Sequence, residues 1–297
     1  IFITDNSGNA IVANNGTAAV MVGRAATAAD VTSIVLNMGA GNDTVTSNSS
    51  NDALTINGDA DTDTVSFAGA TNIGANNLSV TAEMVSQTAA ITATGTATFN
   101  VGAGNDLTLN SANDFGTLVI TCGNNVAVTD ANALVLGAST VSGTLNLTTS
   151  GTITDAGTIA VTGTTTLNAG ANDITLNDGD GTYGTFELTA TNVTIDEAAA
   201  TDLGASTVGG TLDVTSTGDI TDSGTIAVTG TTTLDANAGA NDVTLDDGDG
   251  TFGTFELTAN NVTIDEAAAT DIGASTVGGT LDVTSTGDIT DSGTIAV

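Results

Sequence analysis

Short runs of alternating apolar and polar residues dominate the chain, and polar turns separate them. In "GTLDVTSTGDI" (210–220), Leu212 and Val214 alternate with Asp213 and Thr215. A period of two, with branched residues in the runs and glycine, asparagine and aspartate between them, is typical of short half-buried strands. No stretch sustains a period of 3.6, and threonine and glycine are poor helix formers. The pattern therefore predicts an all-β fold.

The chain also repeats itself at long range, with segments that return almost letter for letter. These segments are 151–167 with 218–234, 178–202 with 247–271, and 204–228 with 273–297. The repeat is 67 and then 69 residues long, because the second copy contains two extra residues near Ala236. A catalytic residue needs a unique environment, whereas duplicated segments provide the same environment twice. The duplication therefore indicates a repeat architecture rather than a single active site.

Each long repeat consists of three similar phrases of about twenty residues, which predict three coils per repeat. One phrase cannot bury its apolar face alone, but stacked coils can, since each coil adds its strands to those of the coil below. We therefore predict a parallel β-solenoid. Coils of 19–27 residues favour a right-handed β-helix over the left-handed type, whose coils keep a strict multiple of six residues.

One apolar residue near the start of each phrase is predicted to point inward and to stack on its equivalents. These inner anchors are Leu145, Leu167, Phe186, Leu212, Leu234, Phe255 and Leu281. A string of small β-sandwiches is the alternative fold. It would require unrelated phrases within each long repeat, and the phrases are alike, so the solenoid is preferred.

Charge limits the partners that the chain can have. The sequence has 34 acidic residues, no histidine and one basic residue, Arg24, so its formal net charge is −33. Such a chain cannot neutralise the phosphates of nucleic acid or an anionic membrane surface. No apolar run approaches the roughly 20 residues of a membrane span. We expect divalent cations as partners, and the alternative is a solvated acidic surface that keeps the protein soluble.

The residue after each inner anchor is predicted to face outward. In the last long repeat these residues are Asp213, Asp235, Glu256 and Asp282. We expect them to lie about 4.8 Å above one another in successive coils. Unit charges at that distance repel by about 3–4 kcal/mol at an effective dielectric constant of about 20. The stack should therefore depend on bound or screening cations.

The phrase "GGTLDVTSTGDITDSGTIAVTGTTTL" (209–234) resembles the repeats of filamentous-haemagglutinin-like and other giant bacterial surface proteins. The resemblance covers most of residues 78–297 and rests on pattern more than on invariant residues. It implies an exported β-helical shaft of an adhesin or a cell-surface fibre, and therefore an extracellular or cell-surface location.

Upstream, "GAGNDTVTSNSSNDALTINGDADTDTVSF" (39–67) is similar to the calcium-binding nonapeptide repeats of RTX toxins. The residues on that family's pattern are Gly39, Gly41, Asp43 and Val45, with Asp52 and Asp61 following at steps of nine. The middle copy lacks the glycines. The resemblance implies Ca²⁺ ligands at Asp43, Asp61 and Asp63, and "GAGNDLTL" (102–109) repeats the motif around Asp106.

Two further loops carry acidic residues of the same kind. Asp178 and Asp180 lie in one "DGDG" segment, and Asp247 and Asp249 lie in its copy. Carboxylate oxygens suit Ca²⁺, which takes six to eight oxygen ligands, whereas the lack of histidine disfavours transition metals. We expect Ca²⁺ as the cofactor. The alternative is that these residues only form turns, which aspartate and glycine favour.

The function that the pattern favours is a non-catalytic structural shaft or fibre segment. A polysaccharide-degrading β-helix enzyme would need clustered carboxylates, which Asp196 with Glu197 and Asp265 with Glu266 provide. Because this pair is duplicated with its surroundings, we expect no enzyme. A glycan-binding module is the alternative, although the chain has only seven Phe, one Tyr and no Trp.

We expect three regions along the chain. Residues 1–35 form irregular N-terminal coils or continue an upstream region, residues 36–77 form the RTX-like coils, and residues 78–297 form about three long repeats. The repeat breaks off at Val297, so we expect a segment of a longer or processed polypeptide. Its strand edges should stack end to end on further copies or on a flanking solenoid.

Overall fold

The computed structural model describes residues 2–4, 10–15, 18–19, 33–47, 52–237 and 240–297. Over these residues the chain forms strands and turns without any helix, so no helix there could cross a membrane. It divides into two compact units, Ile1–Thr149 and Ser150–Val297. Most of the predicted irregular region 1–35 lies outside the described residues.

The strands of the first unit are β1 (Phe2–Thr4), β2 (Ala10–Asn15), β3 (Ala18–Ala19), β4 (Ser33–Asn37), β5 (Thr44–Ser47), β6 (Ala53–Asn57), β7 (Thr64–Phe67), β8 (Thr71–Gly74), β9 (Leu78–Thr81), β10 (Met84–Gln87), β11 (Ile91–Asn100), β12 (Leu107–Cys122), β13 (Val126–Asp130), β14 (Leu134–Val141) and β15 (Leu145–Thr149). β2 pairs antiparallel with β1, β3 and β5. From β4 onward the strands pair in parallel, one coil above another, as in β4–β6–β9–β11 and β5–β7–β10.

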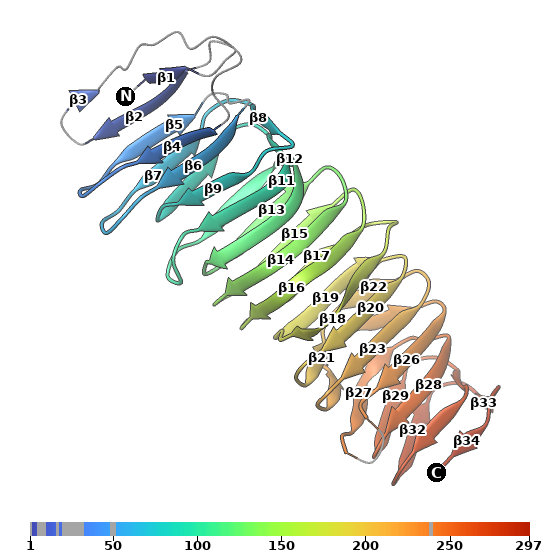
Figure 1. Ribbon diagram of the computed structural model, residues 1–297. Coiled ribbons are helices and arrows are strands. Elements are labelled where there is room, and N and C mark those ends of the chain that lie inside the picture. The colour runs from blue at the N-terminus through green and yellow to red at the C-terminus, as the bar shows by residue number, and fades with distance from the viewer. Residues whose placement is uncertain (1, 5–9, 16–17, 20–32, 48–51, 238–239) are drawn as a thin grey trace. The chain divides into compact units, whose positions relative to one another are not determined.

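The strands of the second unit are β16 (Ile153–Val161), β17 (Thr165–Asn168), β18 (Ile174–Gly181), β19 (Thr185–Ala190), β20 (Val193–Glu197), β21 (Thr201–Leu203), β22 (Ser206–Val208), β23 (Leu212–Ser216), β24 (Ile220–Asp222), β25 (Ile226–Val228), β26 (Thr231–Asp235), β27 (Val243–Gly250), β28 (Thr254–Ala259), β29 (Val262–Glu266), β30 (Thr270–Ile272), β31 (Ser275–Val277), β32 (Leu281–Ser285), β33 (Ile289–Asp291) and β34 (Ile295–Ala296). One sheet runs β16–β18–β20–β23–β26–β28, and the other runs β17–β19–β21–β24–β27–β29–β32 (Figure 1). Each unit is therefore a stack of parallel coils, and the predicted all-β parallel solenoid is confirmed.

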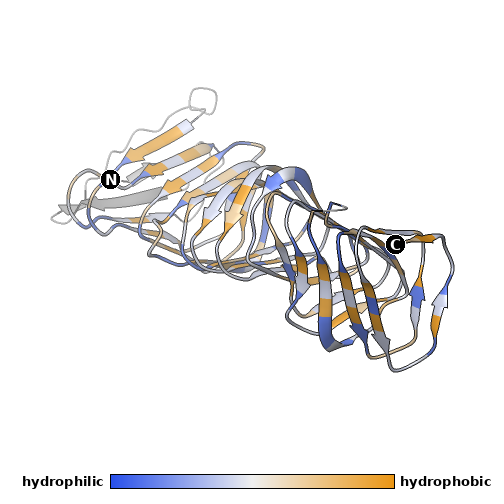
Figure 2. Cartoon of the chain, turned by 90° about the horizontal axis from the view of Figure 1, so that it is seen from below, coloured by the Kyte–Doolittle hydropathy of each residue, from blue (hydrophilic) through white to orange (hydrophobic). Residues whose placement is uncertain are grey.

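The core consists of the inward residues of the alternating pattern, and orange and blue positions alternate along many strands in Figure 2. Six of the seven inner anchors are buried, and Leu281, in the last coil, is partly exposed. The anchors do not all stack on one another. Leu212 pairs with Val193 in the coil before and with Thr232 in the coil after, whereas Leu234 pairs with Val214.

The long repeat spans three and a half coils, where the phrase count predicts three. In one sheet, Ile153 pairs with Ile174, Ile174 pairs with Val193, and Val193 pairs with Leu212. Leu212 therefore lies three coils after Ile153. Its equivalent one repeat later, Ile220, lies half a coil further on, in the opposite sheet. Identical residues therefore alternate between the two faces from one repeat to the next.

The coils vary in length without losing their pairing. Hydrogen-bonded neighbours in adjacent coils lie 17 residues apart at Thr185–Asp202 and 24 apart at Asp222–Asp246, so the shortest coils fall below the predicted 19 residues. The two extra residues of the second copy lengthen one such coil. Ile220 still pairs with Val243, the equivalent of the pair Ile153–Ile174.

Replacing Leu212 by Asp should destabilise the protein by several kcal/mol, because the substitution places an unpaired charge among apolar neighbours. Leu281→Asp is a matched control, since the local sequence is identical but the side chain is partly exposed. Urea unfolding followed by circular dichroism should show a clearly smaller loss for the control. Equal losses in both variants would contradict the placement of Leu212 in the core.

Candidate functional site

Asp43 and Asp63 occupy equivalent positions in two successive coils, directly before β5 and β7. The N–H of Asp43 donates to Oδ1 of Asp63 (2.9 Å), and the N–H of Asp59 donates to Oδ2 (3.1 Å). Both carboxylates are buried, and Oδ2 of Asp43 has no hydrogen-bond partner. Burial raises the pKa of Asp63, and the charges of Glu83 and Asp43 add to this shift. The structure thus brings two of the three predicted ligands together.

Asp61 does not join this pair. It is exposed, and its Oδ2 accepts the N–H of Gly41 (3.0 Å). The predicted step of nine residues does not set the coil here, because Thr44 pairs with Thr64 and the step is 20. Gly39 and Gly41 have φ angles of 81° and 112°, a region that favours glycine.

Asp106 forms a hydrogen-bonded clamp between coils. Its Oδ1 accepts the backbone N–H of Asn125 (3.1 Å) and the side-chain amides of Asn124 (2.9 Å) and Asn125 (3.0 Å). These bonds, led by the one from the backbone of Asn125, lower the pKa of Asp106. The same clamp recurs as Asp173 with Asn192 and as Asp242 with Asn261. In each case an aspartate of one coil accepts hydrogen bonds from an asparagine of the next coil, and these bonds hold the two coils together.

Asp180 and Asp249 also bond to the preceding coil. Oδ2 of Asp180 accepts the hydroxyl of Thr158 (2.6 Å), and Oδ2 of Asp249 accepts that of Thr225. All four aspartates of the "DGDG" segments are exposed. The second aspartate of each segment differs from the first in accepting a threonine hydroxyl from the preceding coil.

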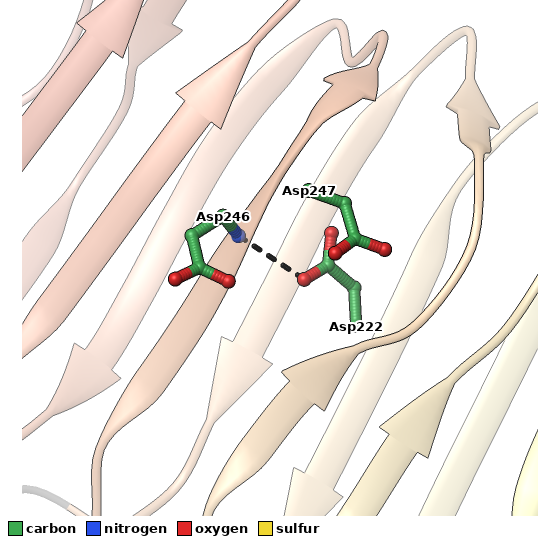
Figure 3. A group of neighbouring side chains, drawn as sticks. All are labelled: Asp222, Asp246 and Asp247. Atoms are coloured by element: carbon green, nitrogen blue, oxygen red, sulfur yellow. Dashed lines mark hydrogen bonds between the residues drawn. The ribbon is translucent and has the colours of Figure 1, made fainter.

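The densest acidic cluster contains Asp222 on β24 and Asp246 and Asp247 on β27 (Figure 3). Carboxylate oxygens of all three lie within 4.8 Å of one another. The N–H of Asp246 donates to Oδ1 of Asp222 (3.1 Å). Burial raises the pKa of Asp222 to about 6, and the charges of Asp247 and Asp246 contribute. The described residues include no basic side chain that could balance this charge.

The equivalent group of residues one repeat earlier has one carboxylate fewer. Asp155 takes the place of Asp222, and it accepts the N–H of Asn177 (3.1 Å), which replaces Asp246. Burial raises the pKa of Asp155, with a contribution from the charge of Asp178. Sequence reasoning missed Asp155 and Asp222, because each lies one coil before its acidic partners. The recurring "ITD" one coil upstream of "DGDG" is the signal that could have found them.

The prediction that the outward carboxylates stack directly above one another in successive coils is wrong. Asp213 pairs with Thr233, which pairs with Glu256, so a threonine separates the two acids. Asp235 lies between Thr215 and Thr258, and Asp282 lies in the opposite sheet. The prediction failed because it assumed that each phrase of the sequence forms one coil, whereas the spacing between phrases differs from the spacing between paired residues of adjacent coils. Burial raises the pKa of Asp213, and the charge of Asp235 adds to the shift.

Asp196 and Glu197, the carboxylates considered for a polysaccharide-degrading enzyme, point to different sides of β20. Asp196 faces outward, whereas Glu197 is buried. Glu197 accepts the N–H of Tyr183 at Oε1 (2.9 Å) and the hydroxyl of Thr201 at Oε2 (2.7 Å). Glu266 accepts the equivalent bonds from Phe252 and Thr270. Both oxygens of each glutamate are therefore engaged in holding the coil together.

The stacked coils and their inter-coil acidic clamps define a repetitive parallel β-solenoid protein. The sequence model of a family described as repeats of unknown function (DUF5649) matches residues 3–121, 123–185, 190–257 and 259–297. The chain belongs to this family. No curated protein and no solved structure matches the chain.

Stability should fall as the pH rises from 5 to 8. Burial raises the pKa of Glu197 to about 7, so the folded state favours the neutral acid. The stability gained in this way is present below the pKa of an unfolded glutamate and is lost as the pH rises through about 7. Glu197→Gln should reduce this dependence, to which the raised pKa values of Asp222 and Asp130 also contribute, and it should raise the free energy of unfolding at pH 8 by about 2–3 kcal/mol relative to wild type.

Urea unfolding at several pH values measures this effect, and Glu187→Gln is the control because Glu187 faces outward. The control should keep the wild-type pH dependence. A Glu197→Gln variant with the wild-type slope between pH 6 and 8 would show that Glu197 is charged in the fold.

Proposed function

We propose that the chain is a non-catalytic structural shaft or fibre segment of an exported bacterial cell-surface or extracellular protein, with an acidic surface stabilised by cations. The observation that carries the proposal is the half-integral repeat. The segments 153–161 and 220–228 are nearly identical, yet they lie on opposite faces of the second unit. A repeated segment that fits both faces of the solenoid extends the stack of coils, and it does not form a single site on one face.

The surface chemistry supports a shaft over the glycan-binding alternative. All seven described aromatic side chains are buried, namely Phe67, Phe99, Phe115, Tyr183, Phe186, Phe252 and Phe255. Tyrosine and tryptophan, which combine a large apolar ring with a polar group, are enriched at binding interfaces. The outward positions of the described coils instead carry threonine, asparagine and aspartate. Support for export comes from the resemblance of residues 209–234 to bacterial surface-protein repeats.

End-to-end association with a flanking solenoid or with further copies of the same chain is part of the proposal. A stack of parallel coils has a strand edge at each end, and an unpaired strand edge is a template for pairing.

Inserting a second copy of residues 204–272 after Ile272 tests the shaft directly. The junction keeps the natural Ile-Gly sequence, because Gly204 replaces Gly273 as the next residue. Three and a half added coils should lengthen the particle by about 17 Å, at about 4.8 Å per coil. We expect this increase in small-angle X-ray scattering, with one cooperative thermal transition at or above the wild-type temperature.

A copy shortened to residues 204–267 is the control, because it ends within a coil and shifts the register of the strands that follow. It should unfold at a lower temperature. A separate thermal transition for the full insertion would contradict a continuous shaft, and saturable binding of a polysaccharide by the wild-type chain would favour the glycan-binding alternative.

A further inference from the structure

The first unit has a sheet face without any charged side chain. β4, β6 and β9 pair in succession, and the pairing continues into the C-terminal parts of β11 and β12 (Figure 1). Inward and outward residues alternate along these strands. We call the outward residues of these segments the neutral face, because no residue is charged in 33–37, 53–57, 78–81, 96–100 and 117–121.

One row of outward side chains crosses the neutral face, with one side chain from each coil. In chain order the row contains Val35, Thr55, Ser79, Thr98 and Val119, and each residue pairs with the next. Neighbouring side chains of the row are therefore about 4.8 Å apart. Val35 is 55% exposed, and the other four are half-buried. All five side chains are short, so the row forms a low and regular ridge on the sheet.

The strands of the second unit carry charge instead. The outward side chains of β20, β23, β26 and β28 include Asp196, Asp213, Asp235 and Glu256. Of the 34 acidic residues of the chain, 23 follow residue 150 and 11 precede it. A chain with a net charge of −33 repels its own copies, and the repulsion is weakest between surfaces that carry no charge. Two copies can therefore meet at the neutral face more easily than at these acidic strands.

The other sheet of the first unit is also uncharged along β5, β7 and β10. It aligns three parallel strands there, and its outward row of Thr44, Thr64 and Met84 ends in a long side chain that is 54% exposed. The neutral face aligns five strands with short side chains. It is therefore the larger and more regular of the two surfaces.

We propose that the neutral face packs against the neutral face of a second copy of the chain, so that two solenoids associate side by side. Both copies present rows of short side chains at the same spacing, and such rows interdigitate when sheets of stacked strands pack face to face. A charged partner would lose hydration at this face without meeting a countercharge. This association goes beyond the shaft proposed above, because it joins solenoids laterally rather than end to end.

The size of the neutral face sets the strength of the contact. Five strands about 4.8 Å apart, each with about five residues of 3.3 Å, cover roughly 300–400 Å². Each partner of a standard protein interface contributes about 800 Å², so one pair of neutral faces forms a weak contact. We expect a dissociation constant between about 10 µM and 1 mM. Sodium chloride should strengthen the contact, because it screens the repulsion between the acidic chains and breaks no ion pair at the face.

Sedimentation velocity over a range of chain concentrations measures this association. Ser79 is the central residue of the row, so in a two-fold symmetric pair it lies close to Ser79 of the other copy. Ser79→Asp should raise the dissociation constant at least tenfold, because it places like charges opposite each other. Ser66→Asp is the matched control, since Ser66 faces outward from β7 in the other sheet, and it should change the constant less than about twofold.

A mixture of the Ser79→Asp chain with a Ser79→Lys chain provides a second test. Opposite charges then meet across the two-fold axis, so the mixture should associate at least tenfold more tightly than either variant alone. Circular dichroism of each variant confirms that it folds. A mixture that associates no better than its components would overturn the proposal, as would equal weakening by Ser79→Asp and Ser66→Asp.

Two further outcomes would assign the neutral face differently. Wild-type association that Ser79→Asp leaves unchanged would overturn the lateral contact and would leave the end-to-end shaft intact. A wild-type chain that stays monomeric at high salt, and that binds a neutral polysaccharide only while Ser79 is unchanged, would overturn a second copy as the occupant of the face in favour of a glycan.

Discussion

The backbone hydrogen-bond ladder between successive coils is the interaction on which the rest of the structure depends. It fixes a spacing of about 4.8 Å, so each side chain meets the side chain at the paired position of the next coil. Inside, Val193, Leu212 and Thr232 meet in this way. Outside, the ladder would force carboxylates against one another, and threonine between Asp213 and Glu256 keeps these two charges two coils apart. A chain with 34 acidic residues tolerates parallel stacking partly through this alternation.

Buried polar side chains complete the ladder where its register shifts. Irregularities fall between Leu176 and Gly181 and at the equivalent place one repeat later. There the N–H groups of Tyr183 and Phe252 donate to Glu197 and Glu266 instead of to a backbone carbonyl. In the first unit, Asn113 and Asp130 accept the N–H groups of Ile91 and Phe115 in the same manner. A buried N–H without an acceptor is costly, which accounts for carboxylates in an otherwise apolar interior.

The sequence alone was sufficient to predict which residues point inward, because alternation at period two is a local property of each strand. Leu167, Phe186, Leu212 and Leu234 are all buried as expected. It was not sufficient to predict which residues meet across coils, because bulges and loops of unequal length separate the phrase spacing from the coil spacing. This is why the acidic column was misplaced and why Asp155 and Asp222 were missed. Asp106 was predicted as a Ca²⁺ ligand, and its hydrogen bond with Asn125 in the next coil became evident only from the register.

The half-integral repeat has a consequence for how such a chain can evolve. A new substitution that is copied with its repeat next appears on the opposite face, so selection acts on its average performance in two environments. Residues that suit only one face are removed by this averaging, and residues acceptable on both are retained. A specialised surface is therefore difficult to acquire by duplication alone. Divergence within a single copy, such as Tyr183 against Phe252, is the route by which one position can gain a property that the others lack.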